Sequence, residues 1–362
     1  MNNDILIIGA GIIGLMTALE CRRAGATVTL LDRSCVGQEA SWAGGGILSP
    51  LYPWKERQSI DALRYWSSRY FPSLAAELLD ATGIDVELNR CGMLIAEVDD
   101  QQLAQNRLSD QDIPFTWVDN NDLTASHPGL KLATNQSLWL PTIEQIRNPR
   151  LLVALKQLLI TLDVTIVEQH QVTQFNLTEC KSRINSVETQ QHNFSAAQVV
   201  LTAGAWSQGL WPRISQESEL HIFPVKGQML LLQAPVASIP SMVLRDHQYI
   251  VPRKDGHVLV GSTVEYTDFD KVTTVPARRQ LKAFFDSLYP IFSELPVIRH
   301  WAGIRPGSNG KPIIAKHPEI ENLYINSGHF RNGLNLAPAS ARLIVDLMIG
   351  REPIVVAHHY SL

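Results

Sequence analysis

The sequence predicts an α/β protein with a β-rich part. We expect a dinucleotide-binding domain of the Rossmann type, assembled from separated segments, and an inserted antiparallel-sheet domain. Residues 4–33 read as a strand, a glycine turn, a helix and a second strand that ends at an acid. Residues 223–264 instead alternate between apolar and polar positions, as antiparallel strands do. Another glycine-bearing strand-to-helix turn occurs near the far end of the chain, at residues 323–338.

These patterns also predict how the chain is divided. A chain of 362 residues is long enough for two lobes. The dinucleotide-binding domain is expected to comprise residues 1–84, 145–215 and 300–362, and the substrate-binding domain residues 85–144 and 216–299.

The opening strand–turn–helix–strand unit contains the glycine pattern of a dinucleotide site. Gly9 allows a tight turn, Gly11 lets the backbone approach a pyrophosphate, and Gly14 lets the helix lie close to the strand. The helix N-terminus then directs unpaired N–H groups at the phosphates. Asp32, which lies 23 residues after Gly9, is placed to accept hydrogen bonds from a ribose. The pattern alone does not distinguish FAD from NAD.

The remaining elements follow from periodicity. Apolar residues at three- and four-residue spacing predict helices at residues 15–23, 59–82, 99–110, 151–162, 276–289 and 338–349. Short apolar runs predict strands at residues 5–8, 27–31, 92–96, 164–167, 198–201, 229–232, 249–252, 258–261 and 323–326, with hairpins between 172 and 187. The strand at 164–167 is expected to join the first sheet as its next parallel member, and a turn at 253–256 to join two antiparallel strands.

Small residues fill the segment that follows the second strand. Residues 34–54 include three consecutive glycines at 44–46 and are predicted to form a loop. Such a loop suits a backbone that passes close to something flat and bulky, although its composition equally fits a flexible connection.

Composition narrows the classes of function. The chain is 45% hydrophobic and 18% charged, and its formal net charge of −4 gives no electrostatic reason to expect nucleic-acid binding. Its four cysteines form no CxxC pair and its histidines no HExxH spacing, so neither disulfides nor a metal site is expected. The N-terminal segment does not read as a signal peptide, and no stretch is apolar for long enough to span a bilayer. We expect a soluble, cytoplasmic protein without stable membrane insertion.

Six motifs carry a resemblance to a known family. They are VTLLDR, ASWAGGGIL, YIVPR, GSTVE, WAGIRPGSNGKPIIA and GHFRNGLNLAP. Together they resemble the FAD-dependent D-amino-acid oxidase family, and within it most closely the glycine oxidases of thiamine biosynthesis. The likeness covers nearly the whole chain.

The resemblance implies which residues hold noncovalent FAD. The pyrophosphate and ribose end corresponds to Gly9, Ala10, Gly11, Ile12, Ile13, Gly14, Asp32 and Arg33. Residues implied along the flavin are Ser41, Trp42, Ala43, Gly45, Gly46 and Ile47. Further implied contacts are Val172 near the adenine, Ala203, Gly204 and Trp206 in a TAGAW turn, and His329, Arg331, Asn332 and Gly333 in the GHFRNG turn.

Three residues are implied at the substrate. Arg305 resembles the carboxylate-binding arginine of the family, and a guanidinium matches a carboxylate in bidentate fashion. Tyr249 is expected to donate its hydroxyl to the same carboxylate, and Arg331 to border the pocket. An interdomain salt bridge for Arg305, a core role for Tyr249 and a turn-capping role for Arg331 remain as structural alternatives.

The implied reaction is oxidative deamination of glycine or another small amine-bearing carboxylate. A hydride passes from Cα to the flavin, and the resulting imine hydrolyses to a 2-oxo acid and ammonia. O₂ is reduced to H₂O₂. No side chain is expected to act as a general base. The product is expected to feed synthesis of the thiamine thiazole, and the family implies a homo-oligomer, a dimer or a tetramer.

Four alternatives stay open. In the first, the substrate is sarcosine, D-alanine, D-proline or another secondary or D-amino acid. In the second, the electron acceptor is a quinone at the membrane. The third is a tRNA-modification oxidase, which requires a basic surface and a partner domain. The fourth is a flavin-binding subunit without turnover of its own.

Overall fold

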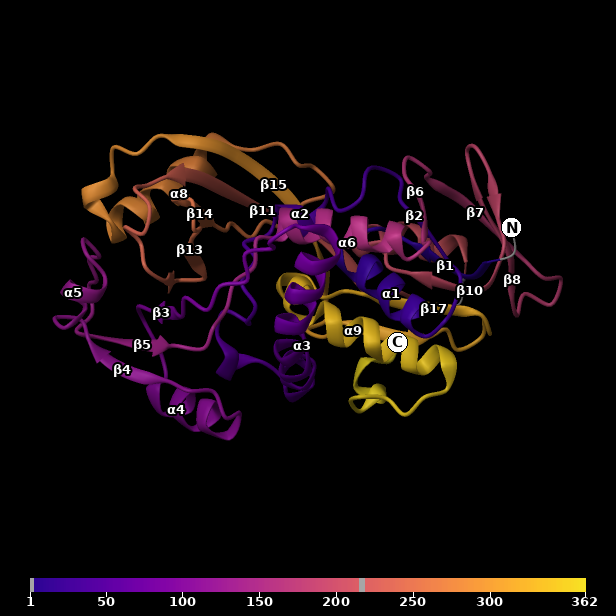
Figure 1. Ribbon diagram of the computed structural model, residues 1–362, viewed down its shortest axis with the longest axis horizontal. Coiled ribbons are helices and arrows are strands. Elements are labelled where there is room, and N and C mark those ends of the chain that lie inside the picture. The colour runs from indigo at the N-terminus through magenta and orange to yellow at the C-terminus, as the bar shows by residue number, and fades with distance from the viewer. Residues whose placement is uncertain (1–2, 215–218) are drawn as a thin grey trace.

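The computed structural model describes residues 3–214 and 219–362, which form two lobes side by side (Figure 1). One lobe is built on a six-stranded sheet and the other on an eight-stranded sheet. The mixed α/β fold with a β-rich second part is confirmed. The predicted domain boundary between residues 215 and 216 lies outside the described residues.

The six-stranded sheet has the order β16-β17-β10-β1-β2-β6. Every neighbouring pair is parallel except β16 and β17, so β16 forms an antiparallel edge. Its strands are β1 (Asn3–Ile8), β2 (Val28–Leu31), β6 (Thr165–Val167), β10 (Ala196–Leu201), β16 (Ile313–Lys316) and β17 (Leu323–Ser327). The prediction that residues 164–167 join this sheet in parallel is confirmed by the pairing of β6 with β2.

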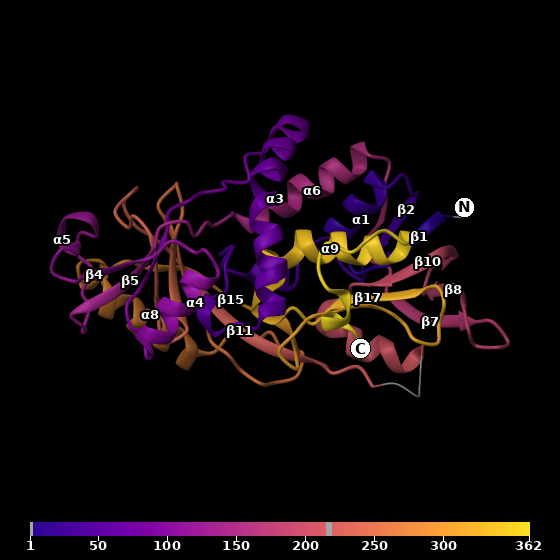
Figure 2. The same cartoon turned by 90° about the horizontal axis from the view of Figure 1, so that it is seen from below.

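The two faces of this sheet are covered differently (Figure 2). Ile5 and Ile7 of β1 contact the core beneath the helices, whereas Leu6 and Ile8 contact a second core on the opposite face. The helices are α1 (Ile12–Arg23), α3 (Gln58–Thr82), α6 (Asn148–Thr161) and α9 (Gly333–Ile349). The opposite face carries a small sheet of β7 (Val172–Leu177), β8 (Ile184–Thr189) and β9 (Asn193–Phe194).

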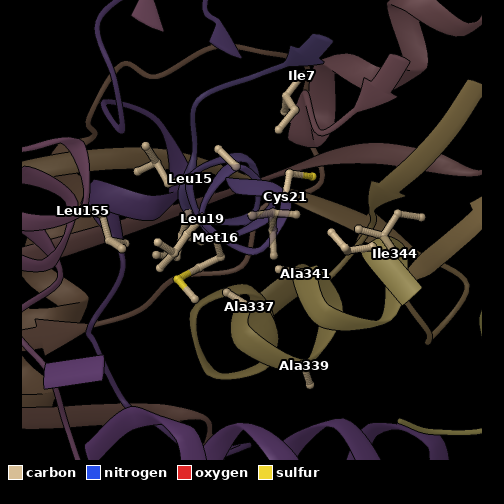
Figure 3. Packing of buried hydrophobic residues seen from close by; sticks show 14 of the residues in the cluster. Ile7, Leu15, Met16, Leu19, Cys21, Leu155, Ala337, Ala339, Ala341 and Ile344 are labelled. Carbon is tan, nitrogen blue, oxygen red and sulfur yellow. The ribbon is translucent and has the colours of Figure 1, made fainter. Parts of the chain in front are cut away.

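Helix α1 is buried on all sides because it lies between the sheet and α9. Every residue from Ile12 to Cys21 is buried, as expected of a helix without a polar face. In Figure 3 Met16 of α1 lies beside Ala337 of α9. Small residues on α9 therefore let the two helices approach closely and hold the start of α1 against the sheet.

Helix α9 begins five residues earlier than predicted. Pro338 reads as a helix start because proline favours the first turn, but the structure places it inside the helix that begins at Gly333. The backbone N–H of Ala339 donates to the Ser67 hydroxyl of α3 at 3.1 Å. A tertiary hydrogen bond thus supplies an acceptor beside the proline, and the start predicted at residue 338 is wrong.

The eight-stranded sheet has the order β15-β11-β14-β13-β12-β3-β5-β4 and is antiparallel except for the parallel pair β3–β12. Helix α8 (Val275–Leu288) packs on it through an apolar cluster that includes Phe284, Phe285 and Leu288. The strands are β3 (Met93–Ile95), β4 (Thr116–Asp119), β5 (Gln136–Leu140), β11 (Ile222–Gln233), β12 (Met242–Arg245), β13 (Gln248–Pro252), β14 (His257–Gly261) and β15 (Val297–Ser308). The remaining α-helices of the described chain are α2 (Ala40–Ala43), α4 (Gln101–Asp110), α5 (Leu123–Ser126) and α7 (Ser207–Leu210).

Strand β15 differs from the predicted domain division. Residues 300–308 were assigned to the dinucleotide-binding part, yet β15 runs unbroken through residue 300 and pairs with β11 in the eight-stranded sheet. In that pairing Arg305 lies opposite Val225. Arg305, which is expected at the substrate, therefore belongs to the antiparallel sheet, because the long β11 partner extends the strand past the predicted boundary.

The segment predicted as a loop after the second strand contains the one-turn helix α2. Among the residues that the structure describes, no helix combines the length and the apolar character needed to cross a membrane.

Candidate active site

A cavity of about 380 Å³ lies where the two lobes meet. Parallel strands end there together, since β1, β10 and β17 are neighbours in one sheet. The carboxyl edge of such a sheet is where open α/β folds bind ligands. Strands β11, β13 and β15 of the other sheet supply the facing wall through Gly227, Tyr249 and Arg305.

The glycine turn after β1 is built as predicted. Gly9 has φ +110°, and a Cβ there would lie 2.6 Å from the Thr202 carbonyl oxygen. At Gly14 a Cβ would lie only 1.9 Å from the Gly9 carbonyl oxygen. No side chain fits at either position, so the start of α1 lies directly against the strand ends and leaves the turn open to the cavity.

The acid after β2 orders the same turn. One carboxylate oxygen of Asp32 accepts the Ala10 N–H at 2.8 Å, and the other accepts the Ser34 N–H at 2.8 Å. Beside it the Arg33 guanidinium lies over the Trp206 ring at 3.8 Å. Asp32, Arg33 and Trp206 all line the cavity, and the ribose contact of Asp32 stays a prediction.

Arg305 occupies a space that only a glycine leaves free. A Cβ at Gly227 on the neighbouring strand would lie 2.1 Å from the Arg305 guanidinium. Its Nη2 donates to the Ser262 hydroxyl at 2.7 Å and its Nη1 to the Thr263 carbonyl at 3.2 Å. Burial lowers the pKa of Arg305, although the neighbouring Tyr249 opposes part of this change. The group stays charged, because an arginine pKa starts above 12.

Tyr249 lies next to this guanidinium and is 7% exposed. A Cβ at Gly45 would lie 2.8 Å from its ring, and a Cβ at Gly261 would lie 3.1 Å from it. Its hydroxyl donates to the Met229 sulfur at 3.8 Å, which is a weak partner for a buried phenol. The hydroxyl therefore remains able to donate to a ligand beside Arg305.

The turn between β17 and α9 brings Arg331 to the same cavity. Phe330 has φ +49°, an uncommon conformation for a bulky residue that is often found at functional sites. The Arg331 Nε has no hydrogen-bond partner among the described residues, and burial lowers the pKa of this guanidinium. Arg331 and Arg305 thus bring two positive charges to one cavity.

His329 is buried between the cavity and α9. Its Nε2 lies 2.9 Å from the Ser340 hydroxyl, and its Nδ1 has no partner in the described chain. Burial lowers the pKa of its imidazole from 6.5 to about 3. The ring is therefore neutral at physiological pH, and it adds no charge beside the two arginines.

This lowered pKa predicts a loss of stability in acid. Between pH 6.5 and 3 the unfolded chain binds a proton at this histidine and the folded chain does not, so stability falls as the pH falls through this window. We expect His329 to contribute about 1.4 kcal/mol to this loss per pH unit. The free energy of unfolding, measured by urea denaturation, should decrease less between pH 7 and pH 5 for His329→Asn than for the wild type. The matched control is His221→Asn at a side chain that is 64% exposed, and it should keep the wild-type decrease.

The structure brings most predicted site residues together at this cavity. Of the predicted set, Ala10, Gly14 and Trp42 do not line it. Ala10 and Gly14 act through the backbone of the glycine turn. Trp42 lies in a smaller neighbouring pocket of about 200 Å³ and packs edge-on against Trp301 at 5.7 Å. The remaining predicted residues are all at the cavity wall.

Several lining residues were not predicted. They come from other segments, and Asn148, Gly227, Met229 and Ser262 are among them. A proline directly after Asn148 marked a helix start, but nothing in the local sequence indicated that its side chain faces the glycine loop. Gly227, within a run predicted to be β-rich, was the one available signal, because an isolated strand glycine often marks a close approach.

Comparison with known proteins identifies the family. A family model described as FAD dependent oxidoreductase matches residues 4–347. The chain belongs to this family. The predicted family and its cofactor, FAD, are therefore confirmed.

Individual relatives of this FAD-dependent oxidoreductase extend over its whole length. It is 41% identical to the glycine oxidase of Pseudomonas aeruginosa, with 100% of this chain and 99% of the relative covered. It is 30% identical to a bifunctional ThiO/ThiG protein of Trichormus variabilis, of which it covers 55%. The crystal structure of glycine oxidase from Geobacillus kaustophilus matches with a TM-score of 0.93 at 26% identity, covering 100% of this chain and 98% of that one.

The residues present fit FAD. One continuous cavity joins the glycine turn and Asp32 to Arg305, as an extended dinucleotide with a redox-active ring at one end requires. At Gly9 and Gly14 any Cβ would overlap neighbouring backbone atoms, so no side chain blocks the turn, and the buried Nδ1 of His329 has no partner in the described chain. The adenosine and pyrophosphate are expected at the glycine turn and the flavin ring near Arg305.

The attachment of FAD is predicted to be noncovalent. None of the four cysteines lies at the wall of the cavity within the described chain, and no thiol is thus placed to bond to the ring. Denaturation in acid followed by centrifugation should leave the yellow flavin entirely in the supernatant. A yellow pellet would contradict the prediction.

Proposed function

We propose that this oxidoreductase oxidises glycine with O₂. The products are glyoxylate, ammonia and H₂O₂, formed through hydrolysis of the imine. The observation that carries the proposal is the pair Arg305 and Arg331. In the described chain no carboxylate lies at ion-pair distance from either guanidinium, although both face one cavity. Two such charges without a protein carboxylate beside them are a receptor for the carboxylate of a ligand.

The residues of the chain orient and select the substrate. Arg305 presents its planar fork to the carboxylate, the Tyr249 hydroxyl donates to it, and Arg331 adds charge at the border. The Tyr249 ring is packed closely against Gly45 and Gly261, which favours a substrate with little or no side chain. Bound FAD supplies the oxidation by accepting a hydride from Cα, and the protein contributes orientation and electrostatics.

The relatives support this choice of substrate and pathway. Several matching proteins carry the name glycine oxidase, one of them at 41% identity over the whole chain. The likeness to the ThiO/ThiG protein supports a place in thiamine thiazole synthesis. We also propose that the protein is a homo-oligomer. We further propose that it is cytoplasmic, because its cysteines are free, as is usual in a reducing compartment.

An oxygen electrode with purified protein tests the function. The panel contains glycine, sarcosine, D-alanine, D-proline and L-proline, with H₂O₂ measured in parallel. The expected result is O₂ consumption matched by peroxide, with the highest kcat/KM for glycine. A higher kcat/KM for another amine would reassign the substrate. Turnover with a quinone but not with O₂ would reassign the acceptor, and no turnover with any amine would contradict the proposal.

A further inference from the structure

The glycine loop beside the cavity is held by side chains that are remote in sequence. The Asn148 side-chain amide donates to the carbonyl oxygens of Ser41, Trp42 and Gly44, at 2.7, 2.9 and 3.1 Å. An amide has only two N–H bonds, so one of them is shared. Asn148 is 1% exposed and lies at the first residue of α6.

Two further donors complete this set. The Trp301 indole N–H donates to the Ala43 carbonyl at 3.1 Å, and Arg253 Nη2 donates to the Gly45 carbonyl at 3.0 Å. We call Asn148, Arg253 and Trp301 the carbonyl clamp. Together its members bind every carbonyl oxygen from Ser41 to Gly45.

Arg253 is an unusual member because it is buried without an acid. It is 8% exposed, and its other donors go to the Gln145 side chain at 2.6 Å and the Ile146 carbonyl at 3.0 Å. Burial lowers the pKa of this guanidinium to about 10. Burying a charge on neutral acceptors alone is costly, which indicates that holding this backbone matters to the protein.

The clamp determines where the N–H groups of the loop point. In a planar trans peptide the C=O and the following N–H point in opposite directions. Because Asn148 holds the Gly44 carbonyl and Arg253 holds the Gly45 carbonyl, the N–H groups of Gly45 and Gly46 point away from the clamp. The Gly46 carbonyl likewise accepts the Ile146 N–H at 2.8 Å, which turns the Ile47 N–H in the same direction.

These three N–H groups have no hydrogen-bond acceptor among the described residues. Within the described chain the backbone N–H groups of Gly45, Gly46 and Ile47 donate to no protein acceptor. All three residues line the large cavity, and Gly45 and Gly46 are buried. Buried N–H groups without an acceptor are rare in proteins. Three in a row along a cavity wall are placed to donate to a ligand.

We propose that Asn148 and Arg253 are positioning residues. Through the carbonyl clamp they aim three consecutive N–H groups at acceptor atoms of the flavin ring. Fixed dipoles of this kind stabilise the negative charge that the ring gains on reduction, and they require no reorganisation when it forms. The clamp thus raises the reduction potential of the flavin, although no clamp side chain needs to touch it. The inference rests on FAD occupying this cavity, as in the proposed function.

The test is the flavin potential of Asn148→Ala holoprotein, together with its affinity for sulfite. Sulfite adds to the flavin ring and leaves negative charge on it, as reduction does. We expect the sulfite Kd to rise about tenfold. The same factor in the reduction equilibrium corresponds to a potential lower by about 30 mV for a two-electron couple. Both values are read from flavin absorbance. The sulfite Kd comes from addition of sulfite, and the potential comes from reduction with dithionite beside a reference dye. No amine is used, so a failure of the glycine proposal leaves this test unaffected.

A matched control separates positioning from folding. Asn322 is 2% exposed, its amide donates to the Ile184 carbonyl at 3.0 Å, and it does not line the cavity. Asn322→Ala also removes a buried amide that binds backbone, and it should leave the potential and the sulfite Kd unchanged. An equal shift in Asn322→Ala would overturn the proposal.

A second clamp variant covers the case in which Asn148→Ala yields no holoprotein. Arg253→Lys keeps the positive charge but loses the fork that reaches Gly45, Gln145 and Ile146 together. Its potential should fall and its sulfite Kd rise, in the same direction as for Asn148→Ala. Wild-type values in whichever of these clamp variants binds FAD would overturn the proposal.

Discussion

Arg305→Ala is expected to raise the KM for glycine about 10²–10³-fold while the yellow flavin spectrum is retained. This change corresponds to about 3–4 kcal/mol of binding free energy, the range expected when one member of a hydrogen-bonded charge pair is removed. The reason is that Arg305 lies on β15 of the antiparallel sheet. Its loss removes the carboxylate fork and leaves intact the glycine turn at which the cofactor is expected to bind.

Steady-state kinetics with FAD-saturated protein measure this effect. Arg299→Ala is the matched control, because Arg299 lies on the same strand, is exposed and stacks on Trp42 at 4.6 Å outside the main cavity. Its KM should stay near the wild-type value. A normal KM for Arg305→Ala would show that the carboxylate binds elsewhere.

Gly46→Ala is expected to lower the affinity for FAD at least about tenfold. Gly46 has φ +77°, and a Cβ there would lie 2.0 Å from the Ile146 carbonyl oxygen. The left-handed conformation alone costs an alanine about 1–2 kcal/mol, and the contact with Ile146 forces the loop to move as well. Because this loop carries the free N–H groups along the cavity, its movement disrupts the cofactor site.

FAD titration of the apoprotein by flavin fluorescence measures this loss. Gly350→Ala is the control, since Gly350 has φ +69° at the end of α9 and no atom within 4 Å of the added Cβ. It carries the backbone cost without the contact, so it should lower stability slightly and keep wild-type affinity. Normal FAD affinity in Gly46→Ala would contradict the role assigned to this loop.

Much of the six-stranded lobe was predictable because its signals are local. Periodicity located α3 and its end at Gly83, which adopts the left-handed conformation with φ +70°. Short apolar runs located β1, β2 and β6, whose parallel order follows from the strand–helix–strand connection. These features depend on residues that are neighbours in the chain.

The second lobe was less predictable because its pairing is distant. Strands β4, β5 and β12 carried no pattern strong enough to be predicted, and the parallel pair β3–β12 joins residues about 150 positions apart. The extension of β15 across residue 300 depends on the length of β11. Pairing of this kind is determined by the partner strand and is not visible in either segment alone.

By itself the sequence determined the glycine turn at Gly9, Gly11 and Gly14 and predicted a dinucleotide site there with Asp32, because these residues meet steric and hydrogen-bonding demands within one short unit. The GHFRNG turn and Arg305 added a flavin and a carboxylate through their resemblance to a family. Only the tertiary structure showed that Asn148, Arg253 and Trp301 hold the glycine loop. Their donors come from three separate segments, and their role depends on which way each peptide of residues 41–46 is turned, a property that long-range hydrogen bonds decide.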